Sequence, residues 1–369
     1  MNEAKIDFDL DIYPKLPKRM DYRIGCIGAG FIMKDIQLLS YRDIGFNPIA
    51  ITSLSSESAK EAAKQWDIPK TYKSYKELIK DKDIEILDIA IPPDKQIDVI
   101  REAADENDHI KGILAQKPLA MDYNEALEMV NICEKADIKL AVNHNMRYDH
   151  SFRALKTLLN RGYLGEPVIA TIEMRAIPHW QEYLKYYKRL TFLNMSIHHI
   201  DIFRYLFGDP DYILASTRTD PRTKFKHTDG IVMYILEYEN DFRALGLDDV
   251  WAWPGKGDEP EREVYVKWRV EGLDGMAQGK IGWPQYPVHT PSTIDYVSKK
   301  IPGNWISPRW PEAYFPDGFY GTMAQLLIAI ENNEDPEISG KDNLNTIAAV
   351  EACYKSIEEG RKISPKEFL

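Results

Sequence analysis

Two stretches of the chain carry side chains that could polarise a hydroxyl group and move its proton. Lys117 follows a buried apolar run and is held by Pro118, which predicts an ammonium at the mouth of a parallel sheet. In the second stretch, Asn194 precedes His198 by four residues and Asp201 follows it by three. Residues at these spacings can share one face of a helix. A histidine flanked by an amide and a carboxylate can shuttle a proton near neutral pH.

Each of these residues also has a structural interpretation that the sequence leaves open. Lys117 could be a surface lysine after a strand, and Asn194 could cap the helix while the histidines pack or face solvent. A metal site made of His198, His199 and Asp201 is less favoured, because adjacent histidines on a helix point in different directions. We therefore expect no bound metal.

A glycine turn near the start of the chain could cradle a phosphate. Residues 24–27 read as a buried strand, the turn Gly28-Ala29-Gly30 follows, and apolar residues then recur at helical spacing. In this context the first glycine permits the tight turn, and the second lets the backbone approach a pyrophosphate at the helix N-terminus. Met33 stands where the third glycine of the pattern would be. An ordinary strand-to-helix turn is the alternative.

The predicted cofactor site lies at the carboxyl ends of the parallel strands, where such sheets bind ligands. The second strand ends at Ser53 with neither a carboxylate for a ribose 2′-hydroxyl nor an arginine for a 2′-phosphate. The sequence therefore favours NAD slightly and does not exclude NADP. The predicted cofactor-binding residues are Gly28, Ala29, Gly30, Phe31, Ile32, Ser53, Ile91, Pro92, Gln96, Gln116, Lys117 and Asn145.

Polar side chains after the last parallel strand suit a sugar or polyol. We predict three catalytic residues, which are Lys117, His198 and Asn194. The predicted substrate-binding residues are Lys117, Asn145, Arg147, Tyr148, Arg175, His179, Trp180, Asn194 and His198. For each residue at this junction, local capping or a surface position is the alternative.

Composition limits the class of protein. The chain has 369 residues, 44% of them hydrophobic, which is typical of a globular protein and long enough for two domains. Its net charge of -11 argues against a nucleic-acid partner. Three scattered cysteines indicate reduced core residues rather than disulfides. No apolar run is long enough to span a membrane and no secretory signal opens the chain, so we expect a cytoplasmic protein.

Periodicity predicts an α/β fold in two parts. Residues 21–142 alternate strands with helices, which indicates a Rossmann domain with a doubly wound parallel sheet. Residues 143–369 predict an α+β domain with a large open, mainly antiparallel sheet, where substrate binding and oligomerisation are expected. Residues 1–20 form an extension, either a disordered tail or a segment that contacts a neighbouring subunit through Ile12, Tyr13 and Leu16. Five tryptophans are expected in loops near the second sheet, where they could stack on sugar faces: Trp251, Trp253, Trp283, Trp305 and Trp310.

Taken together, these stretches resemble the glucose–fructose oxidoreductase / inositol dehydrogenase / MocA (Gfo/Idh/MocA) family of NAD(P)-dependent oxidoreductases. The resemblance runs from Tyr22 to about Ile363, and several motifs in the right order are more specific than any one of them. The motifs are IGCIGAGFIMKD, AIPPDKQ, AQKPLAMDYNEA, NHNMRY, GYLGEPV, NMSIHHIDIFRYLFG and the closing FYGTMAQLLIAIENNEDPEISGKDNLNTIAAVEACYKSIEEGRKI.

The resemblance implies roles for the two candidate groups, and the chain departs from the family pattern around both. Lys117 corresponds to the lysine of the family's E-K-P motif, and His198 to the catalytic acid/base of its D-x-x-x-H motif. Gln116 replaces the usual glutamate, Asn194 replaces the usual aspartate, and Gln96 replaces a common histidine. Asn194 is a weaker electrostatic partner for an imidazolium than aspartate would be.

The implied reaction is reversible hydride transfer between nicotinamide and a secondary hydroxyl of a pyranose, glycoside or cyclic polyol, with C3 as the expected position. In that reaction His198 takes the hydroxyl proton while Lys117 polarises the oxygen, and a relay through Asp201 is left open. The outer sheet face of the family often forms a homo-oligomer, which we expect here as well. Two alternatives remain: an NAD-dependent glycoside hydrolase that works by oxidation and elimination, and a non-catalytic sugar or dinucleotide sensor.

Overall fold

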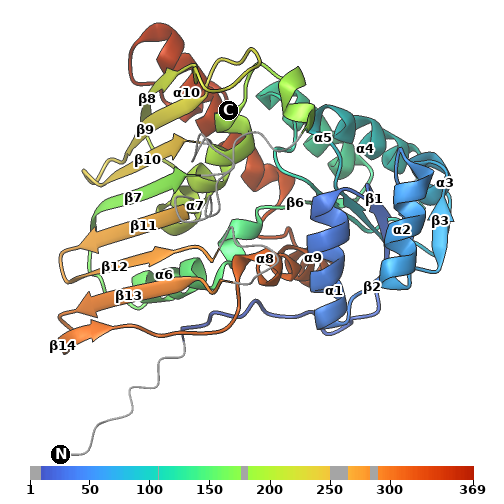
Figure 1. The fold of residues 1–369 in the computed structure, drawn as a ribbon, viewed down its shortest axis with the longest axis horizontal. Coiled ribbons are helices and arrows are strands. Elements are labelled where there is room, and N and C mark those ends of the chain that lie inside the picture. Colours follow the sequence, from blue (N-terminus) through green and yellow to red (C-terminus); the bar gives the residue numbers. More distant parts are fainter. Residues whose placement is uncertain (1–9, 107, 176–181, 250–264, 283–289) are drawn as a thin grey trace, which may run out of the picture.

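Strands near the start of the chain form a six-stranded, all-parallel sheet, seen on the right of Figure 1. The computed structural model describes residues 10–106, 108–175, 182–249, 265–282 and 290–369. The sheet order β3-β2-β1-β4-β5-β6 reverses between β1 and β4, and doubly wound sheets bind ligands at such a point. The strands are β1 (Arg23–Ile27), β2 (Asn47–Thr52), β3 (Lys70–Tyr72), β4 (Ile86–Ile89), β5 (Gly112–Ala115) and β6 (Lys139–Val142).

Helices connect these strands and confirm the predicted Rossmann pattern. They are η1 (Ile32–Gln37), α1 (Leu38–Ile44), α2 (Ser56–Trp66), α3 (Tyr75–Ile79), η2 (Pro93–Lys95), α4 (Gln96–Asp105) and α5 (Tyr123–Lys135). Ser55 caps α2 by accepting a hydrogen bond from the N–H of Ser58. The periodicity misses β3, because three residues are too few to show alternation.

The rest of the chain builds an eight-stranded sheet in the order β14-β13-β12-β11-β7-β10-β9-β8. Its strands are β7 (Pro167–Arg175), β8 (Tyr212–Arg218), β9 (Ile231–Glu237), β10 (Arg243–Asp249), β11 (Tyr265–Gly272), β12 (Gly275–Lys280), β13 (Thr293–Ser298) and β14 (Ile301–Ile306). Every neighbouring pair is antiparallel except β7 with β10, which confirms the mainly antiparallel prediction.

The last two strands correct the prediction for the tryptophan loops. Trp305 lies on β14 rather than in a loop, and Trp310 follows that strand with its side chain buried. Trp251, Trp253 and Trp283 lie outside the described residues.

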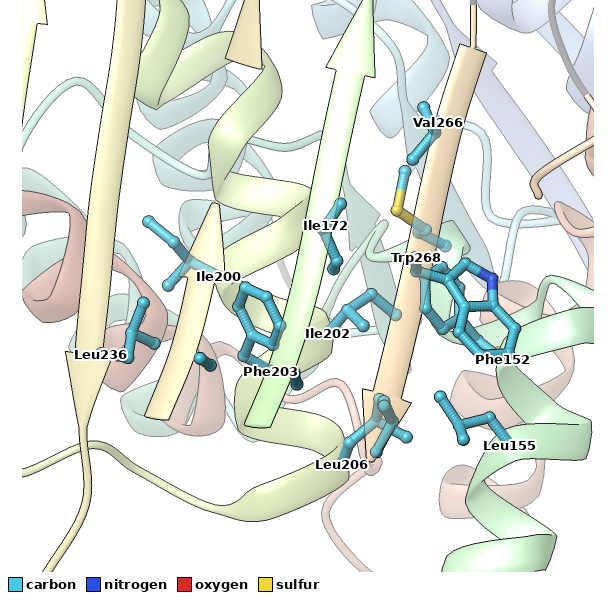
Figure 2. Close-up of a cluster of buried hydrophobic side chains, with 14 of the residues drawn as sticks. Phe152, Leu155, Ile172, Ile200, Ile202, Phe203, Leu206, Leu236, Val266 and Trp268 are labelled. Atoms are coloured by element: carbon cyan, nitrogen blue, oxygen red, sulfur yellow. The ribbon is translucent and has the colours of Figure 1, made fainter. Parts of the chain in front are cut away.

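The remaining helices are η3 (Asn145–Tyr148), α6 (His150–Asn160), η4 (Glu182–Tyr186), η5 (Phe192–Ser196), α7 (Ile197–Phe207), α8 (Tyr314–Asp317), α9 (Tyr320–Asn332), α10 (Gly340–Glu359) and η7 (Pro365–Glu367). Helix α7 packs on the second sheet through the predicted apolar stripe of Ile197, Ile200, Phe203 and Leu206, all buried. Figure 2 shows Ile200, Phe203 and Leu206 in one cluster with Trp268 of β11. This packing fixes the helix that carries His198.

Helices α9 and α10 complete the core of the first sheet, which the expected boundary at residue 142 does not anticipate. Met323 of α9 belongs to the same buried cluster as Ile24 of β1. On α10, Ile347 packs into the cluster beneath the first sheet while Val350 packs into that of the second. The end of the chain therefore joins the two sheets.

Residues 10–20 lie against the rest of the same chain. The guanidinium of Arg19 donates to both carboxylate oxygens of Glu85, at 2.9 and 2.7 Å. The hydroxyl of Tyr13 donates to Glu312 at 2.8 Å. The disordered-tail interpretation is thus wrong for this segment, and contact with a neighbouring subunit stays a prediction.

The three cysteines Cys26, Cys133 and Cys353 are free and buried, as predicted for core residues. Among the described helices, none combines the length and the apolarity that crossing a membrane requires.

Candidate functional site

The glycine turn after β1 lies against the ends of two neighbouring strands. Gly28 has a φ of +107°, and a Cβ at this position would lie 2.3 Å from the carbonyl oxygen of Ala90 and 3.3 Å from Ile91. Its N–H donates to the carbonyl of Thr52 at 2.8 Å, which brings the turn beside Ser53. The backbone conformation therefore requires glycine at this position. The turn lies close to Ser53 and Ile91, which belong to two other predicted cofactor segments. The predicted residues Ala29 and Pro92 adjoin Gly28 and Ile91 in the chain.

The second glycine leaves the outer side of the turn open. No heavy atom of the described residues lies within 4 Å of the place that a Cβ would take at Gly30. Phe31 and Ile32, which begin the following helix, pack against the core of the second sheet. Met33 is fully buried in the same cluster as Tyr41, so at the third-glycine position it acts as a packing residue. An open glycine turn before a helix, at the reversal point of the sheet, fits the diphosphate of a dinucleotide.

Lys117 reaches from the edge of the first sheet to the second domain. It follows β5, and a cis peptide bond joins it to Pro118. Its Nζ donates a hydrogen bond to the backbone carbonyl oxygen of Asn194 at 2.6 Å. Burial lowers the pKa of the ammonium from 10.5 to about 7, so the group titrates near neutral pH.

His198 lies one helical turn beyond the carbonyl that Lys117 contacts. The π-helix η5 runs directly into α7, so Asn194 and His198 occupy successive turns. His198 is 6% exposed, and its Nδ1 has no hydrogen-bond partner in the part of the chain that the structure describes. Burial, together with the charge of Lys117, holds the pKa of His198 well below its ordinary value. A neutral imidazole therefore lies one helical turn beyond the carbonyl to which a titratable ammonium is hydrogen-bonded.

The carboxylate that follows His198 is paired with an arginine. Arg147 donates from Nε and Nη2 to the two oxygens of Asp201, both at 2.6 Å, and Nη2 also reaches Asp342 at 2.7 Å. Burial by itself would raise the pKa of Asp201, but the charge of Arg147 outweighs it and lowers that pKa to about 2. No hydrogen bond among the described residues joins Asp201 to His198, so no observed contact supports a proton relay through Asp201. Arg147, which we expected at the substrate, is committed to two carboxylates.

Gln96 and Gln116, both expected at the cofactor, contact each other. Gln96 is fully buried, and its Oε1 accepts from the N–H of Gln116 at 2.7 Å. Its Nε2 donates to the carbonyl oxygens of Gln116, Pro118 and Leu119 at distances of 2.9, 3.0 and 3.0 Å. The Oε1 of Gln116 accepts from the N–H of Lys117 at 3.1 Å. The two amides thus surround the loop that carries the lysine.

Of three further residues that we expected at the substrate, Asn145 and Arg175 have polar partners within the protein, and Tyr148 is buried. Asn145 accepts a hydrogen bond from the hydroxyl of Tyr314. Tyr148 is 1% exposed, in the buried cluster that also holds Ile24 and Met323. Arg175 ends β7 and pairs with Asp249 at 2.7 Å. Their contact with substrate stays a prediction. His179 and Trp180 lie outside the described residues.

His144 is a neighbour of the site that the sequence reasoning missed. Its Nε2 lies 2.6 Å from the side-chain nitrogen of Asn343, and its Nδ1 lies 3.6 Å from Asp201. Because the amide nitrogen is a donor, Nε2 is the acceptor and the ring proton sits on Nδ1, facing Asp201. Burial lowers the pKa of His144 to about 4, so this ring is neutral. The sequence signal that could have identified His144 is its position between the two asparagines of NHNMRY.

Two sequence models of one family match the chain. The model described as an oxidoreductase family with an NAD-binding Rossmann fold matches residues 22–144. The model of the GFO/IDH/MocA C-terminal domain matches residues 152–278. Together they span more than half of the chain and include all of the first sheet and strands β7 to β11 of the second.

Named relatives are similar over almost the whole length. A D-apiose dehydrogenase of Rhizobium rhizogenes is 28% identical, with 91% of this chain and 95% of that protein covered. A myo-inositol 2-dehydrogenase of Thermotoga maritima is 23% identical, with 94% and 99% covered. A solved oxidoreductase of Agrobacterium radiobacter, in complex with NAD+, L-tartaric acid and magnesium, shares the fold with a TM-score of 0.79 at 24% identity, and 94% of this chain and 99% of that one are covered. The family models and the open glycine turn lead to one conclusion: the chain belongs to the Gfo/Idh/MocA family of oxidoreductases, with NAD as cofactor.

Proposed function

We propose that the protein oxidises a secondary hydroxyl of a sugar or cyclic polyol to a ketone, reversibly, with NAD. The observation that carries the proposal is the 2.6 Å hydrogen bond from Lys117 Nζ to the carbonyl of Asn194, one turn before His198. This contact supports a joint role, because it holds an ammonium of one domain beside an imidazole of the other. Lys117 also follows β5, in the sheet whose β1 end carries the Gly28 turn.

In this proposal His198 accepts the hydroxyl proton and Lys117 polarises the oxygen. Nδ1 of His198 is buried, so Nε2 is the nitrogen that can face a substrate hydroxyl. The low pKa keeps the ring neutral at pH 7, and a neutral ring can take up a proton. A protonated Lys117 donates to the same oxygen and stabilises the negative charge that develops there. NAD, held at the turn of Gly28 and Gly30, supplies the hydride acceptor when bound.

The substrate class is supported by the relatives and by the chemistry of the site. One relative is named for D-apiose and another for myo-inositol, which favours a sugar or a cyclic polyol. The C3 hydroxyl of a pyranose or glycoside is our finer proposal, and it rests on the family resemblance. Ser53, with no arginine beside it, supports NAD over its 2′-phosphate.

A panel of pyranoses, methyl glycosides and cyclic polyols tests the proposal. Reduced nicotinamide should accumulate with at least one member, and NMR of the product should place the new carbonyl at C3. Release of the glycoside's leaving group without net reduced nicotinamide would favour the NAD-dependent hydrolase instead. Binding of NAD with no reduction across the panel would favour the sensor.

We further propose that the outer face of the second sheet joins copies of the chain. Leu214 of β8 pairs with Ile235 of β9, which pairs with Leu245 of β10, so exposed apolar side chains form a continuous row. Helices α6 and α7 lie on the other side of this sheet (Figure 1). Contiguous exposed apolar surface marks interaction sites. Ile235→Asp should dissociate the oligomer in sedimentation velocity, and a monomeric wild type would contradict the proposal. On strands β7 to β10 the exposed apolar residues of this face are Ile169, Tyr212, Leu214, Met233, Ile235 and Leu245.

A cytoplasmic location is also a proposal. It is supported by the free, buried thiols of Cys26, Cys133 and Cys353, since such thiols suit a reducing compartment. Fractionation of the native host tests it.

A further inference from the structure

We infer that Gln96 is a positioning residue, which fixes Lys117 through the loop around it and touches neither substrate nor cofactor. The inference rests on the catalytic role proposed for Lys117. It replaces the sequence-based expectation that Gln96 binds the cofactor.

The side-chain amide of Gln96 is directed at a single loop. Its Oε1 accepts from the N–H of Gln116 at 2.7 Å. Its Nε2 lies 2.9 Å from the carbonyl oxygen of Gln116 and 3.0 Å from those of Pro118 and Leu119. The two hydrogens of that nitrogen are thus shared among three acceptors, and none remains for a ligand. Because Gln96 is 0% exposed, these bonds are shielded from water.

These contacts bracket Lys117 in the sequence. The residue before it and the two residues after it are bonded to Gln96, so the backbone of Lys117 cannot shift without breaking a buried hydrogen bond. Gln116 adds a bond from the N–H of Lys117 to its own Oε1. From this fixed origin, the lysine side chain extends to the carbonyl of Asn194. The direction of the ammonium therefore depends on the loop.

The segment that carries Gln96 contacts both the neighbouring strand end and the second domain. It is the first residue of α4, after β4, whereas Lys117 follows β5, and these strands pair in the sheet. Asp94, two residues before Gln96, accepts a hydrogen bond from the hydroxyl of Tyr187. The start of α4 is thus bonded to the lysine loop, and Asp94 just before it is bonded to the domain that carries His198. This arrangement helps to set the separation between the two groups.

Gln96→Met tests the inference, because it keeps the length of the side chain and removes all four hydrogen bonds. We expect kcat to fall about 10²-fold, the usual cost of a displacement of about 1 Å in a reacting group. NAD affinity should be unchanged. The alkaline limb of kcat/KM should move from near pH 7 toward 10.5, because water that enters the loosened loop relieves the burial that lowers the pKa of Lys117. His198 is the titratable group that faces Lys117, and it stays neutral in this range.

Two further variants separate positioning from general damage to the fold. Gln96→His restores one donor and one acceptor, so its kcat and its alkaline limb should lie between those of the wild type and Gln96→Met. Asp98→Asn changes an exposed residue of the same helix and should leave both unchanged. A merely structural role for Gln96 would lower the melting temperature without moving the limb. If Gln96→Met does not fold, a wild-type kcat and limb in Gln96→His would overturn the inference.

The substrate panel and Lys117→Met together distinguish failure of this inference from failure of the proposed function. If the wild type reduces no NAD with any member of the panel, the proposed function itself fails, whereas wild-type turnover in Lys117→Met would overturn only the role proposed for Lys117. Loss of turnover in Lys117→Met, with wild-type kcat and pH profile in Gln96→Met, would overturn the positioning role alone.

Discussion

Lys117 and His198 belong to the same candidate site but are held in position in different ways. The loop of Lys117 is hydrogen-bonded to Gln96 on both sides, and Nζ has its own acceptor, the carbonyl of Asn194. His198 is held by packing, and its Nδ1 has no partner within the described ranges. Polar contacts thus set the direction of the lysine, whereas burial sets the charge of the histidine.

The difference extends to the neighbouring acids. Asp201 is the carboxylate nearest in sequence to His198, but it accepts hydrogen bonds from Arg147 and Thr346. Asn194 stands where the family usually has aspartate. His198 therefore works without a carboxylate that would stabilise its cation, and Lys117 carries the positive charge of the pair. We expect catalysis to need a neutral histidine beside a charged lysine.

The largest expected loss of turnover comes from removing His198, the residue that is held by packing. His198→Ala should lower kcat about 10³-fold, because the proton acceptor is lost, while NAD still binds. Steady-state kinetics on a substrate from the panel measure this. The control is His199→Asn, which changes the adjacent histidine, whose Nδ1 lies 2.8 Å from Asp248, and should keep kcat. Equal losses in both variants would assign the effect to the packing of α7.

The second prediction asks whether Asp201 serves Arg147 rather than His198. Asp201→Asn should cost about 3–5 kcal/mol of folding free energy in urea denaturation, because it leaves a buried arginine short of a partner. The control is Asp209→Asn. Asp209 bonds Arg204 at 2.5 Å but is 51% exposed, so its loss should cost under about 1 kcal/mol. Equal costs for the two variants would reopen the relay through Asp201.

A smaller loss of turnover is expected from removing Lys117, the residue that is held by polar contacts. Lys117→Met should lower kcat about 10²-fold, the usual cost of removing one donor to a developing oxyanion. Lys117→Arg should recover little, because the planar guanidinium cannot take the place of a compact ammonium. A raised KM with unchanged kcat would instead make Lys117 a residue that binds the ground state.

The smallest expected effect is a shift of the pH profile. It comes from a variant that gives His198 a polar neighbour, as Lys117 already has. Asn194→Asp adds a carboxylate one turn before His198 and leaves in place the backbone carbonyl that Lys117 contacts. The added charge should raise the pKa of both groups, so both limbs of kcat/KM should move up by about one unit. Asn194→Ser removes the amide without adding charge and should leave the limbs in place. Unmoved limbs in Asn194→Asp would mean that this side chain does not face the pair.

Local sequence predicts the parts of the site that a single segment builds. The strand, glycine turn and helix around Gly28 are contiguous, so their geometry follows from short-range rules. Lys117 and His198 each stand in a recognisable motif. Gln96 meets the lysine loop across 20 to 23 residues, and Arg147 meets Asp201 across 54, and no local pattern carries such pairings. Both were therefore expected to face a ligand, although the fold uses them internally.

The fold shows the same division between local and distant information. The parallel sheet could be predicted from its alternating elements, but α9 and α10 return to its core from the end of the chain. Strands β13 and β14 were missed because Pro291, Pro302 and Gly303 around them favour loops. Only the tertiary pairing of β13 with β12, and of β14 with β13, reveals them.

The pH dependence of kcat/KM, compared between the wild type and Lys117→Met, tests most directly the claim that the two groups act as a pair. Activity requires a neutral His198 and a charged Lys117, so it should fall below the pKa of the histidine and above that of the lysine. The wild type should therefore show an alkaline limb near pH 7, where burial places the pKa of Lys117. That limb should disappear in Lys117→Met, and an alkaline limb that persists there unchanged would contradict the claim.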